Sequence, residues 1–274
     1  MYNGWALHQG WKKLMLNAER PIGIFDSGLG GLSVLRTALR MLPEERFLYY
    51  GDIANAPYGT KTEEQVYTYA RAVTGRLMDQ GIKALVIACN TATAAAAAQL
   101  RAEFPDFIIV GMEPALKLAH DQCPEGRILV LATPVSLASE KYRRLYENYG
   151  GHAVSLPCPG LMEFVERGDT DSEELKDYLM NKFAPYLDRP LAAVVLGCTH
   201  YVFLKKTVES LLPPETRVLD GNEGTVRQLG RRLEGGGLLL RHAIGAERYA
   251  LSFNIRQNER EIVARAEQLL RIPE

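Results

Sequence analysis

The chain contains two short stretches of closely related design, V-I-A-C-N-T-A-T at residues 86–93 and V-L-G-C-T-H-Y at residues 195–201. In each, an apolar run typical of a buried strand ends on a cysteine, and a small polar residue able to begin a helix follows. The two cysteines, Cys89 and Cys198, stand 109 positions apart (198 − 89). This repetition predicts two α/β units, each presenting one thiol at the end of a strand.

The rest of the chain alternates in the same way. Strands are expected at 21–25, 47–50, 84–88, 107–110, 127–131, 153–156, 191–196 and 217–219, and helices at 32–41, 62–80, 91–104, 136–149, 161–167, 172–187, 201–212 and 221–233. This order predicts an α/β fold of two pseudo-symmetric domains, each a mostly parallel sheet flanked by helices. Ligands of such sheets bind at the carboxyl ends of the strands, so the active site is expected in the interdomain cleft.

The composition indicates an ordinary folded protein. The formal net charge of −1 gives no electrostatic reason to expect nucleic acid or a membrane as partner, and the apolar runs are too short to span a bilayer. The first twenty residues contain no continuous apolar segment, so we expect no signal peptide and a cytoplasmic location. There, four cysteines are expected to remain thiols.

Two thiols in matched settings point to acid–base chemistry. A buried cysteine in a strand is usually only a small apolar residue, and we assign Cys123 and Cys158, which lack the strand–cysteine–helix setting, to packing. If the two units face one another, Cys89 and Cys198 lie on opposite walls of one cleft. One thiolate could then remove a proton from a substrate carbon while the other thiol returns a proton to the opposite face, which inverts a stereocentre.

Polar residues accompany these thiols. The segment Asp26-Ser-Gly-Leu-Gly-Gly31 follows the first strand, and its glycines suit a tight turn into a helix N-terminus, although it is neither a P-loop nor G-x-G-x-x-G. Asp26 could cap that helix or orient a thiol. His200 follows Cys198 by two positions, and we interpret it as a proton partner, because the additional ligands of a zinc site are not evident.

Together these motifs resemble the cofactor-independent aspartate/glutamate racemase superfamily and, within it, the glutamate racemases. The similar stretches, in the order that the family has them, are IGIFDSGLGGLSV (22–34), GDIANAPYGTK (51–61), VIACNTAT (86–93), PCPGLMEFVERG (157–168) and VLGCTHY (195–201). The resemblance covers about residues 20–235.

The resemblance implies roles for individual residues. Cys89 and Cys198 would be the two acid/base thiols, with Asp26 assisting Cys89, and with His200 and Glu166 assisting Cys198. The substrate would be held by Asp26, Ser27, Tyr58, Gly59, Asn90, Thr91, Thr133, Thr199 and His200. The family uses neither pyridoxal phosphate nor a metal ion, so no cofactor and no metal are expected.

The resemblance also implies a reaction and an organisation. The reaction would interconvert L-glutamate and D-glutamate, supplying D-glutamate for bacterial peptidoglycan synthesis, cell-wall biogenesis and cell shape. Family members commonly form dimers, so a homodimer is expected. In the family the second domain is inserted in the first, which assigns residues 1–112 and 219–274 to one domain and 113–218 to the other.

The chain departs from the family pattern at several positions. Residues 1–19 form an N-terminal extension whose Trp5 and Trp11 are candidates for packing on the body or for contacts. Val202 stands where the family often has proline, and Glu113 adds a carboxylate near the expected domain junction. None of these departures touches the two cysteines.

Four other functions are less favoured. An aspartate racemase would typically carry glutamate at the position of His200, and a single-cysteine decarboxylase would lack one thiol. A regulator that binds an acidic amino acid or a cell-wall precursor without turnover would not need two thiols. A cysteine hydrolase built on Cys198 and His200 is ranked last, because residues two apart rarely meet side chain to side chain and no third orienting residue is evident.

Overall fold

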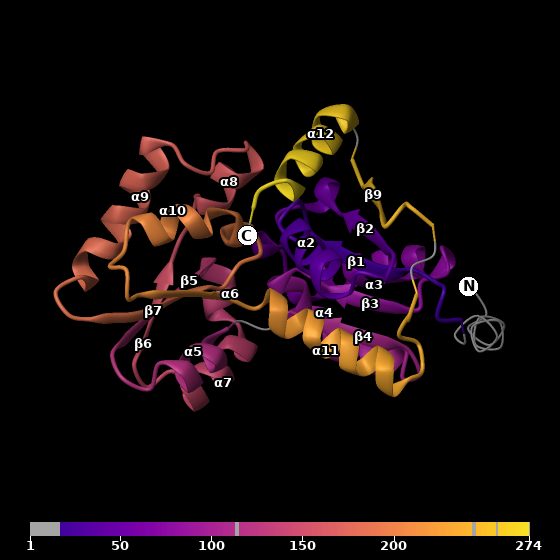
Figure 1. The fold of residues 1–274 in the computed structure, drawn as a ribbon, viewed down its shortest axis with the longest axis horizontal. Helices are drawn as coiled ribbons and strands as arrows, with labels where there is room; N and C mark the ends of the chain where they lie inside the picture. Colours follow the sequence, from indigo (N-terminus) through magenta and orange to yellow (C-terminus); the bar gives the residue numbers. More distant parts are fainter. Residues whose placement is uncertain (1–16, 113–114, 243–244, 256, 274) are drawn as a thin grey trace.

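Two parallel sheets, each enclosed by helices, make up the described residues 17–112, 115–242, 245–255 and 257–273 of this computed structural model (Figure 1). Trp5, Trp11 and Glu113 lie outside the described residues. Within these ranges every strand pair is parallel. The predicted fold class, two parallel-sheet α/β units flanked by helices, is confirmed.

The first sheet has the strand order β4-β3-β1-β2-β9. Its strands are β1 (Ile22–Asp26), β2 (Phe47–Gly51), β3 (Ala84–Ile87), β4 (Ile108–Gly111) and β9 (Tyr249–Phe253), and its helices are α2 (Leu32–Met41), α3 (Glu63–Asp79), α4 (Asn90–Glu103), α11 (Asn222–Gly235) and α12 (Glu259–Leu270). Successive strand residues face opposite sides. Phe25 packs with α3 and α4, whereas Ile24 packs with α2, α11 and α12.

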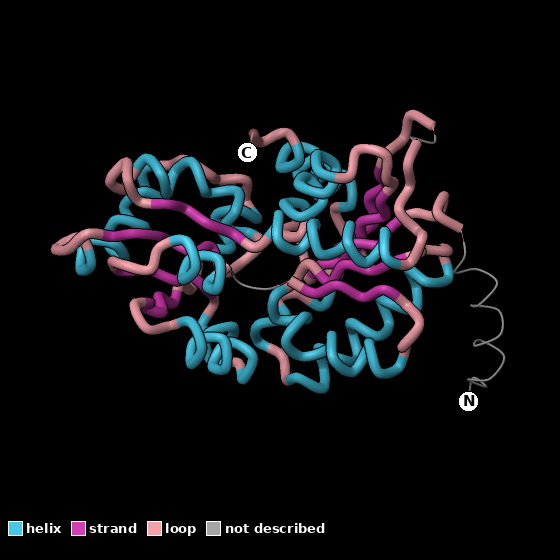
Figure 2. Tube along the Cα trace, turned by 60° about the horizontal axis from the view of Figure 1, so that its bottom comes forward, coloured by secondary structure: helices cyan, strands magenta, loops and turns pink. Residues whose placement is uncertain are grey.

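The second sheet has the order β6-β5-β7-β8. Its strands are β5 (Arg127–Ala132), β6 (Ala153–Pro157), β7 (Leu191–Leu196) and β8 (Arg217–Asp220), and its helices are α5 (Leu116–Gln122), α6 (Pro134–Ala138), α7 (Glu140–Tyr149), α8 (Leu161–Glu166), α9 (Glu173–Phe183) and α10 (Lys205–Ser210). Val130 packs with α5 and α7, and Leu131 joins the opposite core with α8 and α9. Figure 2 shows the strands of both sheets running between layers of helix.

Three predicted helices differ from the structure, including the one expected over 172–187, which ends as the 3₁₀ turn η3 (Ala184–Tyr186) after α9. The helix expected over 136–149 is two helices, since Ser139 is extended and its hydroxyl accepts a hydrogen bond from the Tyr142 N–H. The helix expected over 201–212 begins as a 3₁₀ turn, η4 (His200–Leu204), before α10. Helix α3 begins as expected, with Thr62 and Gln65 forming both bonds of a capping box.

The last part of the chain returns to the first sheet. Strand β9 pairs with β2, and α12 packs on α2. The domain boundaries given above stay a prediction. What the strand order adds is that residues 217–220 belong to the second sheet and residues 249–253 to the first.

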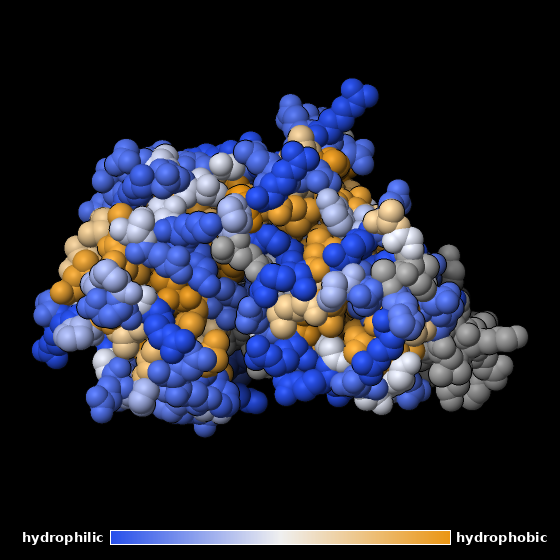
Figure 3. All heavy atoms as spheres, viewed as in Figure 1, coloured by the Kyte–Doolittle hydropathy of each residue, from blue (hydrophilic) through white to orange (hydrophobic). Residues whose placement is uncertain are grey.

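The surface of the face seen in Figure 3 is largely hydrophilic over both halves, with apolar patches between. Within the described ranges, no helix combines the length and the apolar character that a bilayer crossing requires.

Candidate active site

The carboxyl ends of β1, β3 and β7 carry the predicted reactive residues, and Asp26 closes β1. The Gly28 N–H donates to its Oδ1 at 2.8 Å, and Thr199 Oγ1 donates to its Oδ2 at 3.4 Å. Burial raises the pKa of Asp26, and the charge of His200 offsets part of that rise. The carboxyl group is therefore held by hydrogen bonds from both halves of the molecule.

Cys89 follows β3 and caps helix α4. Its Sγ accepts a hydrogen bond from the Ala92 N–H at 3.4 Å, and the thiol donates to Ser27 Oγ at 3.7 Å. Burial raises the pKa of Cys89 to about 12, the charge of Asp26 adds to the rise, and Cys198 makes a smaller contribution. Cys89 is therefore a neutral thiol near pH 7, able to donate a proton.

Cys198 follows β7 in a different electrostatic setting. Its Sγ lies 3.8 Å from His200 Nδ1, and His200 Nε2 lies 2.6 Å from Glu166 Oε1. Burial alone would lower the pKa of His200, but its hydrogen bonds with Cys198 and Glu166 outweigh burial and raise that pKa well above the usual value. A cationic imidazole therefore lies against the sulfur on this side of the site, whereas the Asp26 carboxyl acts on Cys89.

Glu166 completes this chain of three side chains. Burial would raise the pKa of Glu166, but the hydrogen bond and the charge of His200 lower it overall. Residues two apart rarely meet side chain to side chain, but Cys198 and His200 do, at the point where the chain enters the 3₁₀ turn η4.

The glycines of the turn after β1 allow the two halves to approach closely. A Cβ added at Gly30 would lie 2.4 Å from His200 Nδ1 and 2.5 Å from Thr199 Oγ1, and one at Gly28 would lie 2.9 Å from Glu166 Oε1. Any side chain at Gly30 would displace the His200 loop. The turn therefore acts as a close-fitting support for the Cys198 side of the site.

Two further hydrogen bonds join the halves at the same place. Ser33 Oγ on α2 donates to Thr199 O at 3.1 Å, and Asn90 Nδ2 at the start of α4 donates to Gly197 O at 3.2 Å. Cys89 and Cys198 are thus held on facing elements by direct bonds between their neighbours.

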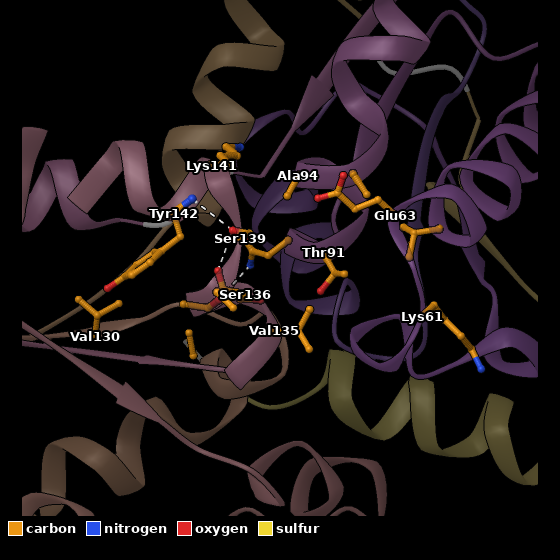
Figure 4. Close-up of a pocket in the computed structure, with 16 residues that line it drawn as sticks. Lys61, Glu63, Thr91, Ala94, Val130, Val135, Ser136, Ser139, Lys141 and Tyr142 are labelled. Atoms are coloured by element: carbon orange, nitrogen blue, oxygen red, sulfur yellow. Dashed lines mark hydrogen bonds between the residues drawn. The ribbon is translucent and has the colours of Figure 1, made fainter. Parts of the chain in front are cut away.

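A pocket of about 190 Å³ lies between the first half of α4 and the α6–α7 segment. It is lined by Thr91 and by Asn90 and Gly197, which are next to Cys89 and Cys198 in the sequence, but neither cysteine lines it. Figure 4 shows Thr91 on one side of the pocket, with Ser136 and Ser139 on the other. Its further lining residues are Lys61, Glu63, Val66, Ala94, Ala95, Val130, Ala132, Val135, Ala138, Lys141 and Tyr142.

The remaining predicted substrate residues lie around this region. Tyr58 is buried, and its OH donates to Asp52 Oδ2 at 2.5 Å. A Cβ at Gly59 would lie 3.9 Å from Val135, on the wall of the pocket. Thr133 caps α6, where its Oγ1 accepts a hydrogen bond from the Ser136 N–H at 3.2 Å. Tyr58 and Thr133 thus hold the loops that border the pocket.

Three supporting residues escaped the sequence analysis. Asp52 also accepts a hydrogen bond from Asn254 Nδ2 at 2.6 Å, Tyr49 donates to Gly28 O at 2.8 Å, and Ser33 binds Thr199 as described. Asp52 lies within the recognised stretch 51–61, which was a usable signal, whereas Tyr49 and Ser33 read as ordinary strand and helix residues. In the described part of the chain, no group of three or more His, Cys, Asp or Glu side chains is placed to hold a metal ion.

Comparison with known proteins identifies the family. The model of the Asp/Glu/Hydantoin racemase family matches residues 23–229. The chain belongs to this family. The glutamate racemase of Clostridium perfringens (strain 13 / Type A) is 49% identical over 216 residues, covering 78% of this chain and 83% of that protein. The glutamate racemase of Clostridium novyi (strain NT) is 45% identical over 257 residues, covering 93% and 98%.

Solved structures give the same result. Glutamate racemase isoform RacE1 from Bacillus anthracis superposes with a TM-score of 0.80 at 28% identity, covering 93% of this chain and 95% of that chain. Glutamate racemase from Francisella tularensis, in complex with D-glutamate, superposes with a TM-score of 0.78 at 26% identity, covering 92% and 94%. The resemblance to glutamate racemases that the motifs indicated is confirmed.

Proposed function

We propose that this protein is a cofactor-independent glutamate racemase that moves protons at Cα with Cys89 and Cys198. The observation that carries the proposal is the contrast between the two thiols. Cys89 is buried beside the Asp26 carboxyl, whereas Cys198 contacts the His200–Glu166 pair. One site is suited to give a proton and the other to take one.

In this mechanism the Cys198 thiolate removes the Cα proton from one face, and an S–H bond forms as the C–H bond breaks. The Cys89 thiol then gives its proton to the opposite face of the planar carbanion. The product has inverted configuration, Cys89 is left as thiolate and Cys198 as thiol. The reverse reaction uses the same groups in exchanged roles, and Asp26 and His200 assist these proton transfers.

The substrate assignment rests on relatives. The Francisella enzyme has been solved in complex with D-glutamate, and the Escherichia coli enzyme in complex with L-glutamate and the activator UDP-MurNAc-ala. Backbone and side-chain donors of Ser27, Asn90, Thr91 and Thr199, adjoining the thiols, would bind the two carboxylates. Tyr58, Gly59 and Thr133 would shape the same site from its border.

The biological role follows the same proposal. D-Glutamate made in the cytoplasm would supply peptidoglycan synthesis, and the protein would act as a homodimer. Sedimentation at micromolar concentration would test the dimer directly, with a monomer mass contradicting it.

The primary test is proton NMR of L-glutamate with the purified protein in D₂O, followed by chiral analysis. We expect loss of the Cα–H signal and appearance of deuterated D-glutamate without added cofactor. Cys89→Ser and Cys198→Ser should each lower the rate by about a thousandfold or more, since each removes one proton carrier. Cys123→Ser is the matched control, because that buried thiol donates to Ala192 O at 3.9 Å in the core of the second sheet. Normal racemisation by both active-site variants would refute the two-thiol mechanism.

A further inference from the structure

The loop that follows β2, residues 52–60, reaches from the first sheet to the opposite wall of the candidate site. Tyr58 of this loop is buried in the same apolar cluster as Cys89. The next residue, Gly59, faces the other half of the molecule, since a Cβ added there would lie 3.9 Å from Val135 on α6. The position of the 52–60 loop therefore sets one border of the site beside a proposed acid/base thiol.

The carboxyl group of Asp52 holds this loop together from inside. It is buried, and both of its oxygens accept hydrogen bonds from Asn55 Nδ2 at 3.1 Å. The Tyr58 OH donates to Oδ2 at 2.5 Å, and Asn254 Nδ2 donates to Oδ1 at 2.6 Å. A buried carboxyl group needs such donors to keep its place. Because the Tyr58 hydroxyl hydrogen is used by Asp52, Tyr58 acts on the site through the position of the loop.

Asn55 and Tyr58 belong to the loop itself, whereas Asn254 comes from the end of β9, which lies beside β2 (Figure 1). Its backbone N–H donates to Gly51 O at 2.8 Å, and its carbonyl accepts from the Ala54 N–H at 2.7 Å. Its neighbour Phe253 covers Gly51 so closely that a Cβ there would lie 2.6 Å from the ring. The end of β9 is thus fixed against the start of the loop, which aims the Asn254 amide at the carboxyl group.

From these contacts we propose that Asn254 is a positioning residue for the racemase reaction. Its side-chain amide holds Asp52, and Asp52 holds Tyr58 and with it the 52–60 loop at the border of the site. The inference rests on the proposed function, because the loop is expected to act on glutamate. It gives a strand that lies beyond the family motifs a part in binding the substrate.

The kinetic test begins with Asn254→Ala, which removes the amide donor and keeps the backbone bonds. A free protein whose loop is less often in place binds its substrate more weakly, in proportion to the fraction in place. We expect KM for glutamate to rise about five- to tenfold, the usual effect of losing a hydrogen bond to a charged group. Bound glutamate would still select the ordered loop, so kcat should stay within about twofold of the parent.

The split between KM and kcat separates this role from a purely structural one. A variant that only unfolds more easily lowers the rate by the same factor at every glutamate concentration and leaves KM unchanged. The matched control is Ser252→Ala on the same strand, because the Ser252 hydroxyl donates to Tyr49 O at 3.1 Å and does not contact Asp52. S252A should keep the KM of the parent.

Exchanging the two side chains tests the contact itself. Asn254→Asp alone places two carboxyl groups where the 2.6 Å hydrogen bond now lies, so KM should rise at least as much as in N254A. Combining it with Asp52→Asn again sets one amide against one carboxyl group. The new amide can donate to position 254 and still accept from the Tyr58 hydroxyl. The double variant should therefore bring KM most of the way back to the parent value.

A second readout does not need turnover. Hydrogen exchange of the peptide that spans the loop would be followed by mass spectrometry in the protein without glutamate. Backbone N–H groups that donate within this segment are those of Asn55, Ala56, Thr60 and Lys61. In N254A they should exchange about five- to tenfold faster, since the lost bond opens the loop by the same factor. S252A and the double variant should match the parent.

A KM or a loop exchange rate of N254A equal to that of S252A would overturn the role of Asn254, as would a double variant no better than N254D. Where the double variant does not fold, N254A and S252A decide. If the unmodified protein fails to racemise glutamate, the proposed function fails, while hydrogen exchange still decides whether Asn254 holds the loop.

Discussion

At the scale of the residue, the buried carboxyl group of Asp26 lowers the stability of the folded protein near pH 7. Burial raises its pKa, so the native state binds a proton at this carboxyl more tightly than the unfolded chain does. Stability contributed by this group therefore falls as the pH rises from the unfolded pKa through the raised native value, and then stays level. This loss of stability accompanies a functional position, because the charge of Asp26 acts on the Cys89 thiol.

Asp26→Asn should separate stability from activity. The amide can still accept the bond from the Gly28 N–H but carries no buried charge, so the variant should be at least as stable as the parent near pH 7 and gain less at pH 4. Racemisation should fall by about a hundredfold, the usual contribution of a proton-transfer assistant. Urea unfolding at both pH values and kcat would be measured. A variant that is both active and unstable would contradict this account.

The sequence predicts site residues that share a local motif, but not residues that meet only in the folded chain. Cys89 and Cys198 were evident from their matched contexts, and His200 from its position two residues after Cys198. Glu166 entered only through the family resemblance, because nothing in the sequence shows that it lies 2.6 Å from His200.

At the scale of elements, the turn between β1 and α2 packs closely against the loop that carries Thr199 and His200. Gly30→Ala would place a methyl group 2.4 Å from His200 Nδ1, so the His200 loop must move. We expect a loss of about 1–3 kcal/mol in unfolding free energy and a fall in kcat/KM of at least about tenfold. The matched control is Gly75→Ala in α3, where a Cβ meets nothing within 4 Å. That change should be neutral or stabilise by up to about 1 kcal/mol.

These two variants would be compared by urea unfolding and by glutamate racemisation. Equal activities for G30A and G75A would mean that the turn does not support the His200 loop.

Sequence patterns missed three features of the fold, each for a reason of its own. Strand β9 lies at the edge of its sheet and is only half buried, so it lacks the continuous apolar run that identified the other strands. Helix α12, which buries Ala266 and Leu269 fully, lies beyond residues 20–235, the range that the family motifs cover. The boundary between α6 and α7 depends on a cap at Ser139, which competes with continuing the helix.

At the scale of the whole molecule, the proposed reactive residues and a buried ion pair lie at opposite edges of the first sheet. The reactive residues lie at the carboxyl ends of the strands, whereas Lys83 immediately precedes β3 at the amino edge. Its Nζ is buried and contacts Glu45 Oε2 at 2.6 Å and Ala18 O at 2.5 Å, while Glu45 Oε1 accepts from the Leu240 N–H at 2.9 Å. The Lys83–Glu45 ion pair and its two backbone hydrogen bonds thus join four segments that are distant in the sequence.

Lys83→Met should therefore lower stability strongly without altering the chemistry. It leaves the Glu45 carboxylate buried without its ion-pair partner, which typically costs about 3–5 kcal/mol. Adding Glu45→Gln removes that charge and can keep the bond from the Leu240 N–H, so the double variant should recover at least about half of the loss. Urea unfolding would measure both variants, and kcat per folded molecule should stay within about twofold of the parent, because the cluster lies across the sheet from the thiols. A double variant no more stable than K83M would show that the unpaired charge is not the cause, and a large fall in kcat would show that the two edges are coupled.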